Sequence, residues 1–314
     1  MNRRFFRPLR KAVARTTATI ALAMAVLTAQ AQPISAPDSA FYLSVNFEAM
    51  KQGQASAPLY RFFNEEILNE LRDEFGPGLI DSLQGVSLFG TGDEQAPVIV
   101  LHGDIPPSAR DRIVDELFRE HDDVELLTDR GRNYYRFGGL DLDWDAGDTG
   151  LQGEHDELWL AFGDRGQTLL TPHRTTLDDF LVQGFLPDAV MAPDLVVIQA
   201  DRALAQGGVD RTHRVFNGPD GSFQSEVFQK IDRFAMLVAE ADGGIEISLE
   251  AHSATPEVAQ ALQNIVQGII SLRALSAEVP PEMAWIEGVR VSRDERITRL
   301  DVAIPPQALT EILD

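Results

Sequence analysis

The sequence predicts an α+β fold, in which antiparallel sheets carry helices packed on one face. Paired runs of alternating apolar and polar residues flank short turns, which is typical of β-hairpins with one buried side. The segments after these pairs open with proline or serine and then place apolar residues at helical spacing. The order of strand, helix, hairpin, helix, hairpin and helix occurs twice, so we expect an internal duplication.

The first half is expected to span residues 32–186. It opens with a strand after Pro37 and Asp38, followed by a helix whose apolar residues recur every three or four positions. An acidic, glycine-rich insert is expected at 138–156. The expected elements are a strand at 41–47, a helix at 58–75, a hairpin of 86–89 and 98–101, a helix capped by Ser108, a hairpin of 158–162 and 168–171, and a helix carrying Leu177, Phe180 and Leu181.

The second half is expected to span residues 187–314. It opens like the first, because Pro193 and Asp194 precede a strand-like run. A long glycine-rich loop at 206–221 then replaces the strong helix of the first half. The expected elements are a strand at 195–200, a hairpin of 234–239 and 245–251, a helix from Pro256, a hairpin of 288–292 and 297–304, and a short helix carrying Leu309, Ile312 and Leu313.

The run Val86-Ser87-Leu88-Phe89-Gly90 before Val98-Ile99-Val100-Leu101, with a later hairpin that ends in a helix, resembles a group of known sequences. These are uncharacterised exported bacterial proteins built of repeated β-hairpin-helix units. The resemblance covers most of the mature chain and implies a fold and a compartment. It implies no activity and no functional residues.

The first 31 residues have the composition of a secretory signal peptide. Six basic residues and no acidic residue precede a short apolar run at 20–27, and Ala29 and Ala31 then supply small side chains for cleavage. The apolar run is shorter than the roughly 20 residues that span a bilayer. We therefore expect cleavage after Ala31, no transmembrane segment in the mature chain, and a soluble product in the periplasm of a Gram-negative bacterium or in the medium.

The chain is strongly acidic. It has 27 Lys and Arg residues against 49 Asp and Glu residues, a net charge of -22. Removal of the six basic residues at the start gives -22 - 6 = -28 for the mature protein. Such a charge repels phosphate backbones, so nucleic acid is excluded as an expected partner.

The sequence predicts no catalytic residues and no cofactor. It has no cysteine, which excludes disulfides, thiolate metal sites, a cysteine nucleophile and lipidation of a cysteine. It has no G-x-S-x-G motif, and Gly90-Thr91-Gly92 lacks the third glycine of a dinucleotide-binding loop. His102 and His252 end the second strands of equivalent hairpins, which favours a structural role for both.

The sequence predicts no metal site, but one acidic segment is a weak alternative candidate for one. Asp143, Asp145, Asp148 and Glu154 crowd the insert of the first half, and hard cations bind converging carboxylates. The segment does not fit an EF-hand loop, because Asp148 stands at the glycine position when Asp143 is counted first. A solvated strand and turn explains the same alternation.

The long loop of the second half holds the candidate ligand-binding residues. Arg211, His213 and Arg214 are locally basic within an acidic chain, and such a loop suits a carboxylate ligand or an acidic partner. The competing interpretation is neutralisation of nearby acids such as Asp201 and Glu226.

These patterns favour a non-enzymatic binding or interaction protein with a site at the junction of its halves. The expected partner is an envelope protein, a peptide or an apolar ligand. Two alternatives stay open: a metal-assisted hydrolase that uses the acidic insert around Asp143, and a structural protein that assembles with itself in the envelope. The binding hypothesis rests on the expectation that no set of ionisable side chains converges in the fold.

Overall fold

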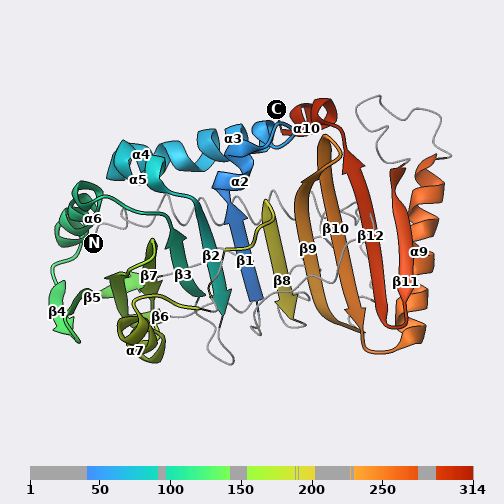
Figure 1. Ribbon diagram of the computed structural model, residues 1–314. Helices are drawn as coiled ribbons and strands as arrows, with labels where there is room; N and C mark the ends of the chain where they lie inside the picture. The colour runs from blue at the N-terminus through green and yellow to red at the C-terminus, as the bar shows by residue number, and fades with distance from the viewer. Residues whose placement is uncertain are drawn as a thin grey trace.

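The computed structural model describes residues 41–90, 97–141, 154–187, 189, 191–201, 227, 230–274 and 288–313. Within this part of the chain, one antiparallel sheet of twelve strands dominates the molecule (Figure 1). The strands are ordered β11-β12-β10-β9-β8-β1-β2-β3-β7-β6-β5-β4. The predicted α+β class is therefore confirmed. The predicted signal peptide and its cleavage site at Ala31 lie outside the described residues.

Apart from β4 and β5, the strands follow the predicted strands and hairpins in both halves. Those of the first half are β1 (Phe41–Asn46), β2 (Gly85–Gly90), β3 (Pro97–His102), β4 (Glu125–Asp129), β5 (Arg132–Asp141), β6 (Glu154–Phe162) and β7 (Gln167–Thr171). Those of the second half are β8 (Val196–Asp201), β9 (Ile231–Ala241), β10 (Gly244–Ser253), β11 (Arg290–Asp294) and β12 (Ile297–Ile304).

The opening strands of the two predicted halves meet at the middle of the sheet. β1 pairs with β8, from Phe41 opposite Ala200 to Val45 opposite Val196. Outward from this pair, β2, β3 and β7 follow on one side, and β9, β10 and β12 follow on the other. This matching order is what a duplication would produce. The duplication itself stays a prediction, because a shared strand order does not establish a shared origin.

The helices lie along the sheet and beyond its two ends (Figure 1). Among the described residues, no helix is long and apolar enough to cross a bilayer. The helices are α2 (Phe47–Gln52), α3 (Ala57–Phe63), the π-helical turn η1 (Asn64–Leu68), α4 (Asn69–Phe75), α5 (Pro77–Ser82), α6 (Pro107–Glu120), α7 (Arg174–Gln183), α9 (Pro256–Ala274) and α10 (Pro306–Leu313).

The helix predicted at 58–75 is interrupted. α3 and α4 are separated by the π-helical turn η1, and both Ile67 and Leu68 are buried there. A π turn holds one more residue than an α turn, so two successive apolar side chains can reach the same core.

The two larger apolar cores of the described residues lie on opposite faces of the sheet, because successive strand residues point to opposite sides. A third, small cluster of Ile231, Ala251 and Leu262 joins α9 to β9 and β10. The main core joins one face to α2–α6 and α10, with Val45, Leu158 and Leu249 among its strand residues. The second core lies on the other face over the first half, and contains Tyr42 and Trp159.

One helix departs from the expected arrangement on a single face. Leu177, Phe180 and Leu181 of α7 pack into the second core, opposite the helices that cover the main core. The residues predicted for this helix are correct, and only its side of the sheet differs. Periodicity identifies the apolar face of a helix but not the face of the sheet that it covers.

The prediction of an irregular acidic insert at 138–156 is partly wrong. β5 continues to Asp141 and β6 begins at Glu154. β4 pairs with β5 in a hairpin that the sequence did not predict. Its turn holds Arg130 at φ 52° and Gly131 at φ 78°, the left-handed conformations of a two-residue hairpin turn. None of the residues of β4 is buried, so its sequence lacks the alternation of apolar and polar residues that predicts a strand.

Candidate functional site

In the second half, the face that carries the second core becomes polar. Val197, in the second core, stands opposite Leu237, and this row continues through Ser248 and Asp301 to Arg290. Directly opposed residues of antiparallel strands project to the same face. Neighbouring rows add more polar side chains, and together they form what we call the polar face: Asp201, Arg233, Ser248, Glu250, His252, Arg299 and Asp301.

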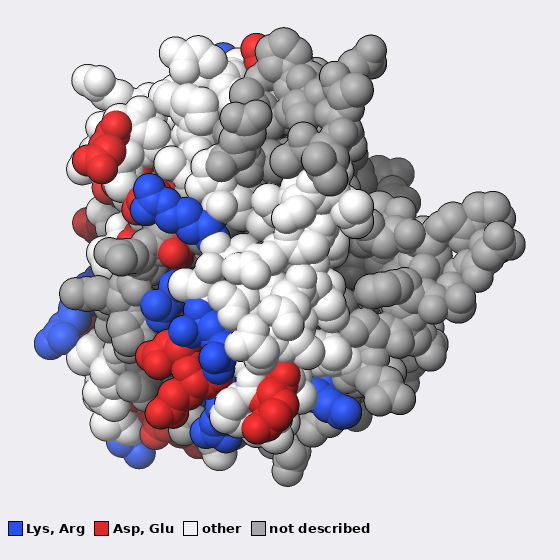
Figure 2. Space-filling model, turned by 90° about the vertical axis from the view of Figure 1, so that its right-hand side faces the viewer, with Lys and Arg blue, Asp and Glu red and all other residues white. Residues whose placement is uncertain are grey.

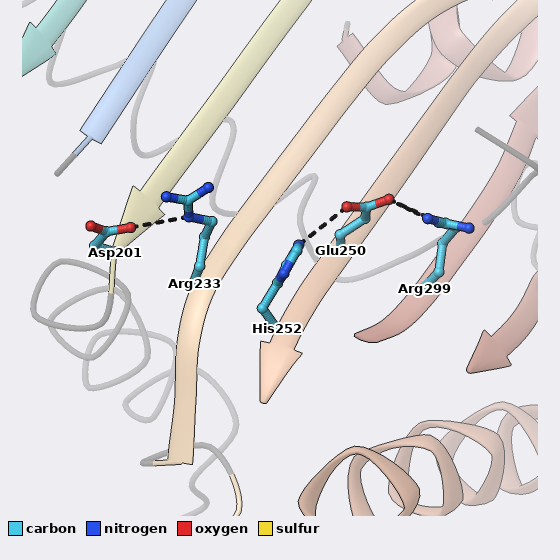
Figure 3. Close-up of polar contacts among 5 residues, drawn as sticks. All are labelled: Asp201, Arg233, Glu250, His252 and Arg299. Carbon is cyan, nitrogen blue, oxygen red and sulfur yellow. Dashed lines mark hydrogen bonds and ion pairs between the residues drawn. The ribbon is translucent and has the colours of Figure 1, made fainter. Parts of the chain in front are cut away.

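Glu250 is the centre of this polar face. Its side chain is 2% exposed, and its Oε1 accepts hydrogen bonds from Nε and Nη2 of Arg299 at 2.9 and 2.6 Å. His252 Nε2 lies 3.3 Å from the other carboxylate oxygen, Oε2 (Figure 3). Burial raises the pKa of Glu250, but the hydrogen bonds from His252 and Arg299 lower it more, so the net shift is downward. Glu250 is therefore held as a carboxylate.

Asp301 is a second buried carboxyl group on the same face. It is 3% exposed, and the Ser248 hydroxyl donates to its Oδ1 at 3.4 Å. Burial raises the pKa of Asp301 to about 6, against the opposing effect of Arg299. Two carboxyl groups with opposite pKa shifts occur in acid–base enzymes. Here both are buried and engaged with neighbours, so the geometry favours a fixed ion network over a catalytic pair.

A third contact lies at the end of the polar face nearest the middle of the sheet. Arg233 Nε on β9 is 3.2 Å from Asp201 Oδ1 on β8 (Figure 3). Both side chains are partly exposed, so this pair contributes at most about 1 kcal/mol to stability. Its position on the surface makes it available to a ligand.

Two hollows border the ion network. The first has a volume of about 460 Å³ and is lined by Asp201, Asp232, Arg233, His252, Ser253 and Arg296. The second has a volume of about 330 Å³ and is lined by Arg290, Ser292, Arg293, Asp294, Ile297, Arg299 and Asp301. Both volumes lie in the range of small-ligand sites, about 300 to 1,000 Å³. Both hollows carry basic and acidic groups, which suits a charged ligand.

Most of the predicted site residues lie outside the described part of the chain. This applies to Arg211, His213 and Arg214, and to Asp143, Asp145 and Asp148. Glu154 begins β6 opposite Asp141. Among the described residues, no group of three or more acidic or histidine side chains is placed to hold a metal ion.

The two histidines predicted to be equivalent have different surroundings. His102 is buried, its Nε2 lies 2.9 Å from the Ser87 hydroxyl, and burial lowers its pKa to about 4. This neutral, enclosed imidazole fits the predicted structural role. His252 instead contacts Glu250 in the ion network and lines the first hollow. Asp201, predicted as a partner of the basic loop, pairs with Arg233.

The expectation that no ionisable side chains converge is wrong, because Glu250, His252, Arg299 and Asp301 form such a cluster. The alternation of apolar and polar residues predicted only one buried side for the hairpin that contains 245–251. In the structure, Ser248 and Glu250 stand opposite Asp301 and Arg299 on another strand. β10 and β12 are separated by a whole helix along the chain, so this register was not visible in the sequence.

Comparisons with known proteins identify no family. No family model matches this chain, and no curated protein matches it. Three solved structures, crystal forms III, I and IV of TP0453, are similar in arrangement at 10% identity, with TM-scores of 0.48, 0.45 and 0.45. They cover 91%, 91% and 88% of this chain, and the match spans 99%, 97% and 93% of TP0453. This similarity assigns no function.

Proposed function

We propose that the chain is an exported, non-enzymatic binding protein that holds a charged peptide segment on the polar face of its second half. The observation that carries this proposal is the pair of hollows, both lined by basic and acidic groups, on either side of one ion network. Of the partners that the sequence suggested, a peptide or an envelope protein suits these linings. An apolar ligand suits them poorly, because it would desolvate charged groups without replacing their hydrogen bonds.

The ion network supports binding because it fixes the shape of the site in advance. Glu250 is held from two sides, by Arg299 and by His252, without any ligand. A preformed site loses less conformational entropy when a ligand binds. Arg233, by contrast, makes only a partly exposed ion pair, which a ligand carboxylate can exchange at little cost.

Calorimetry with three matched peptides tests the proposal. The probes are capped heptapeptides of sequence Thr-X-Val-Thr-X-Val-Thr, in which X is Glu, Lys or Leu. We expect saturable binding of at least one charged peptide and little binding of the Leu peptide. Binding of the Leu peptide alone, or of none of the three, would contradict the proposal.

Two variants locate the site in the same experiment. Arg233→Ala removes a basic group from the first hollow and should weaken binding of the Glu peptide about two- to five-fold, as expected for loss of an exposed ion pair. The control, Arg130→Ala, removes an exposed arginine from the turn between β4 and β5. It should leave the affinity unchanged.

A further inference from the structure

β11 is the outermost strand on the side of the sheet that carries the polar face. Among the described strands it pairs only with β12, from Arg290 opposite Asp301 to Asp294 opposite Ile297. Four of its five residues are exposed, and the fifth, Val291, is partly exposed. α9 packs against β11 on the face of Val291, where Thr298 on β12 donates to the Ala259 carbonyl. Within the described residues no strand pairs with the outer edge of β11, so the backbone N–H and C=O groups of that edge can pair with an added strand.

The side chains of β11 are unusually basic for this acidic molecule. The second hollow contains three arginines, of which Arg290 and Arg293 come from β11 and Arg299 from β12. The Arg299 side chain donates to Glu250, and within the described residues the Arg293 side chain donates only to the carbonyl of Glu295, at 3.1 Å. The Arg290 backbone pairs with Asp301 on β12, whereas its side chain makes no hydrogen bond or ion pair within the described residues. Figure 2 shows basic and acidic side chains interleaved on this side of the molecule, beside a large uncharged surface.

Charged residues on an edge strand can also serve to block unwanted pairing. That role requires only charge. Here the edge also adjoins the second hollow, of about 330 Å³. Arg290, Ser292 and Asp294 line this hollow on the polar face of the sheet. An added strand would place alternate side chains over this hollow, and peptide-binding sheet edges obtain specificity in this way.

We propose that an extended acidic peptide segment adds to the outer edge of β11, which no described strand pairs with, as a further strand, with its carboxylates engaging Arg290 and Arg293. Arg290 and Arg293 are three positions apart, so they lie on opposite faces of the strand. The segment should therefore carry acidic residues at positions i and i+3, one for each arginine. This inference rests on the proposed function and names the class of segment that is bound.

Fluorescence anisotropy with the Glu heptapeptide tests this inference, since its two Glu residues are three positions apart. We expect the Glu peptide to bind more tightly than the Lys peptide. Arg290→Ser and Arg293→Ser should each weaken its binding about two- to five-fold. The double variant R290E/R293E should prefer the Lys peptide. β11 is exposed, so these variants should keep the wild-type circular dichroism spectrum.

A backbone-modified Glu peptide, N-methylated at alternate residues along one edge, separates strand pairing from charge attraction. We expect its binding to fall at least about ten-fold, because N-methylation removes the inter-strand hydrogen bonds on which strand addition depends. Equal binding of this peptide at the polar face would overturn strand addition and leave the proposed function standing. Failure of every heptapeptide to bind the polar face would overturn both. Protection of β11 amides that rises with protein concentration, without peptide, would assign the edge to a second copy and also overturn the inference.

Discussion

At the scale of single residues, Glu250 is the side chain on which the polar face depends. It is 2% exposed and ionised, and Arg299 supplies two of its hydrogen bonds. A buried ion pair is costly to break, because the partner that remains keeps its charge without compensation. The pair contributes less to stability than its geometry suggests, but removal of one member has a large effect.

We predict that Arg299→Ala lowers the free energy of unfolding by about 3 kcal/mol, as expected when one member of a buried pair is lost. The double variant Glu250→Leu/Arg299→Met removes both charges and should recover most of that loss. Urea unfolding followed by circular dichroism measures both. A double variant no more stable than Arg299→Ala would show that Glu250 carries no uncompensated charge in the single variant.

Asp301 gives the polar face a pH dependence of its own. Burial raises its pKa to about 6 in the folded protein, above its ordinary value of 3.8. The folded state thus favours the protonated acid. The stability that this group contributes is present in full below about pH 4 and is lost as pH rises through about 6. The lowered pKa of Glu250 acts in the opposite sense, and its contribution is lost only as pH falls below its ordinary range.

We predict that wild-type stability falls relative to Asp301→Asn as pH rises from about 4.5 to about 7.5. Chemical denaturation at a series of pH values measures the difference between the two proteins. Titratable groups that both proteins contain affect the stability of both equally, so they cancel in this difference. A difference that stays constant over this range would mean that Asp301 does not titrate there.

Residue-scale prediction from the sequence succeeded for apolar positions and failed for polar ones. The stripe of the helix predicted at 58–75 is largely buried as expected, with Phe63, Ile67 and Leu71 in the main core. Glu250 alternates with apolar neighbours in the same way as a solvated residue would. Its burial depends on Arg299, a partner on a strand that no local pattern connects to it.

At the scale of elements, one carboxylate joins the two halves. Glu240 of β9 accepts hydrogen bonds from the backbone N–H groups of Gln54, Ala55 and Ser56, and from the Ser56 hydroxyl at 2.7 Å. These residues form the connection between α2 and α3. Burial raises the pKa of Glu240, but the hydrogen bonds from Ser56 and the backbone outweigh it, so the net shift is downward. Gly53 is confined here, since a Cβ would lie 1.9 Å from Glu240 Oε2.

We predict that Glu240→Ala destabilises the protein by about 1–2 kcal/mol, because several donors lose a charged acceptor at a partly solvated site. Glu65→Ala, at an exposed position of η1, is the matched control and should change stability by less than about 0.5 kcal/mol. Thermal unfolding of both variants measures this. Equal effects of the two substitutions on stability would show that the hydrogen bonds of Glu240 do not stabilise the contact between the halves.

Elements with strong local signals were predictable, and those that depend on distant contacts were not. The hairpin of β9 and β10 turns at Asp242 and Gly243, both at positive φ, and the glycines marked it in the sequence. The hairpin of β4 and β5 has the same geometry at Arg130 and Gly131, but its outer strand is exposed and gave no periodic signal. The side of the sheet chosen by α7 depends on the second core, which forms only when distant strands assemble.

At the scale of the whole molecule, charge and topology act together. The chain carries a net charge of -22, yet one hollow at the edge of its sheet gathers three arginines. An acidic protein repels acidic peptides at long range, and salt screens this repulsion over about 8–10 Å. Contacts with Arg290 and Arg293 act at shorter distance. The candidate site could not be predicted from the sequence, because the residues of the polar face come from four strands, β8, β9, β10 and β12.

Hydrogen exchange of the protein with and without the Glu heptapeptide tests the central claim, binding on the polar face of the second half, most directly. We predict slower exchange at β9, β10, β11 and β12, and unchanged exchange at β4, β5 and α7, which lie toward the opposite end of the sheet. Protection confined to β4, β5 or α7, or no protection at a peptide concentration that saturates binding, would contradict the account.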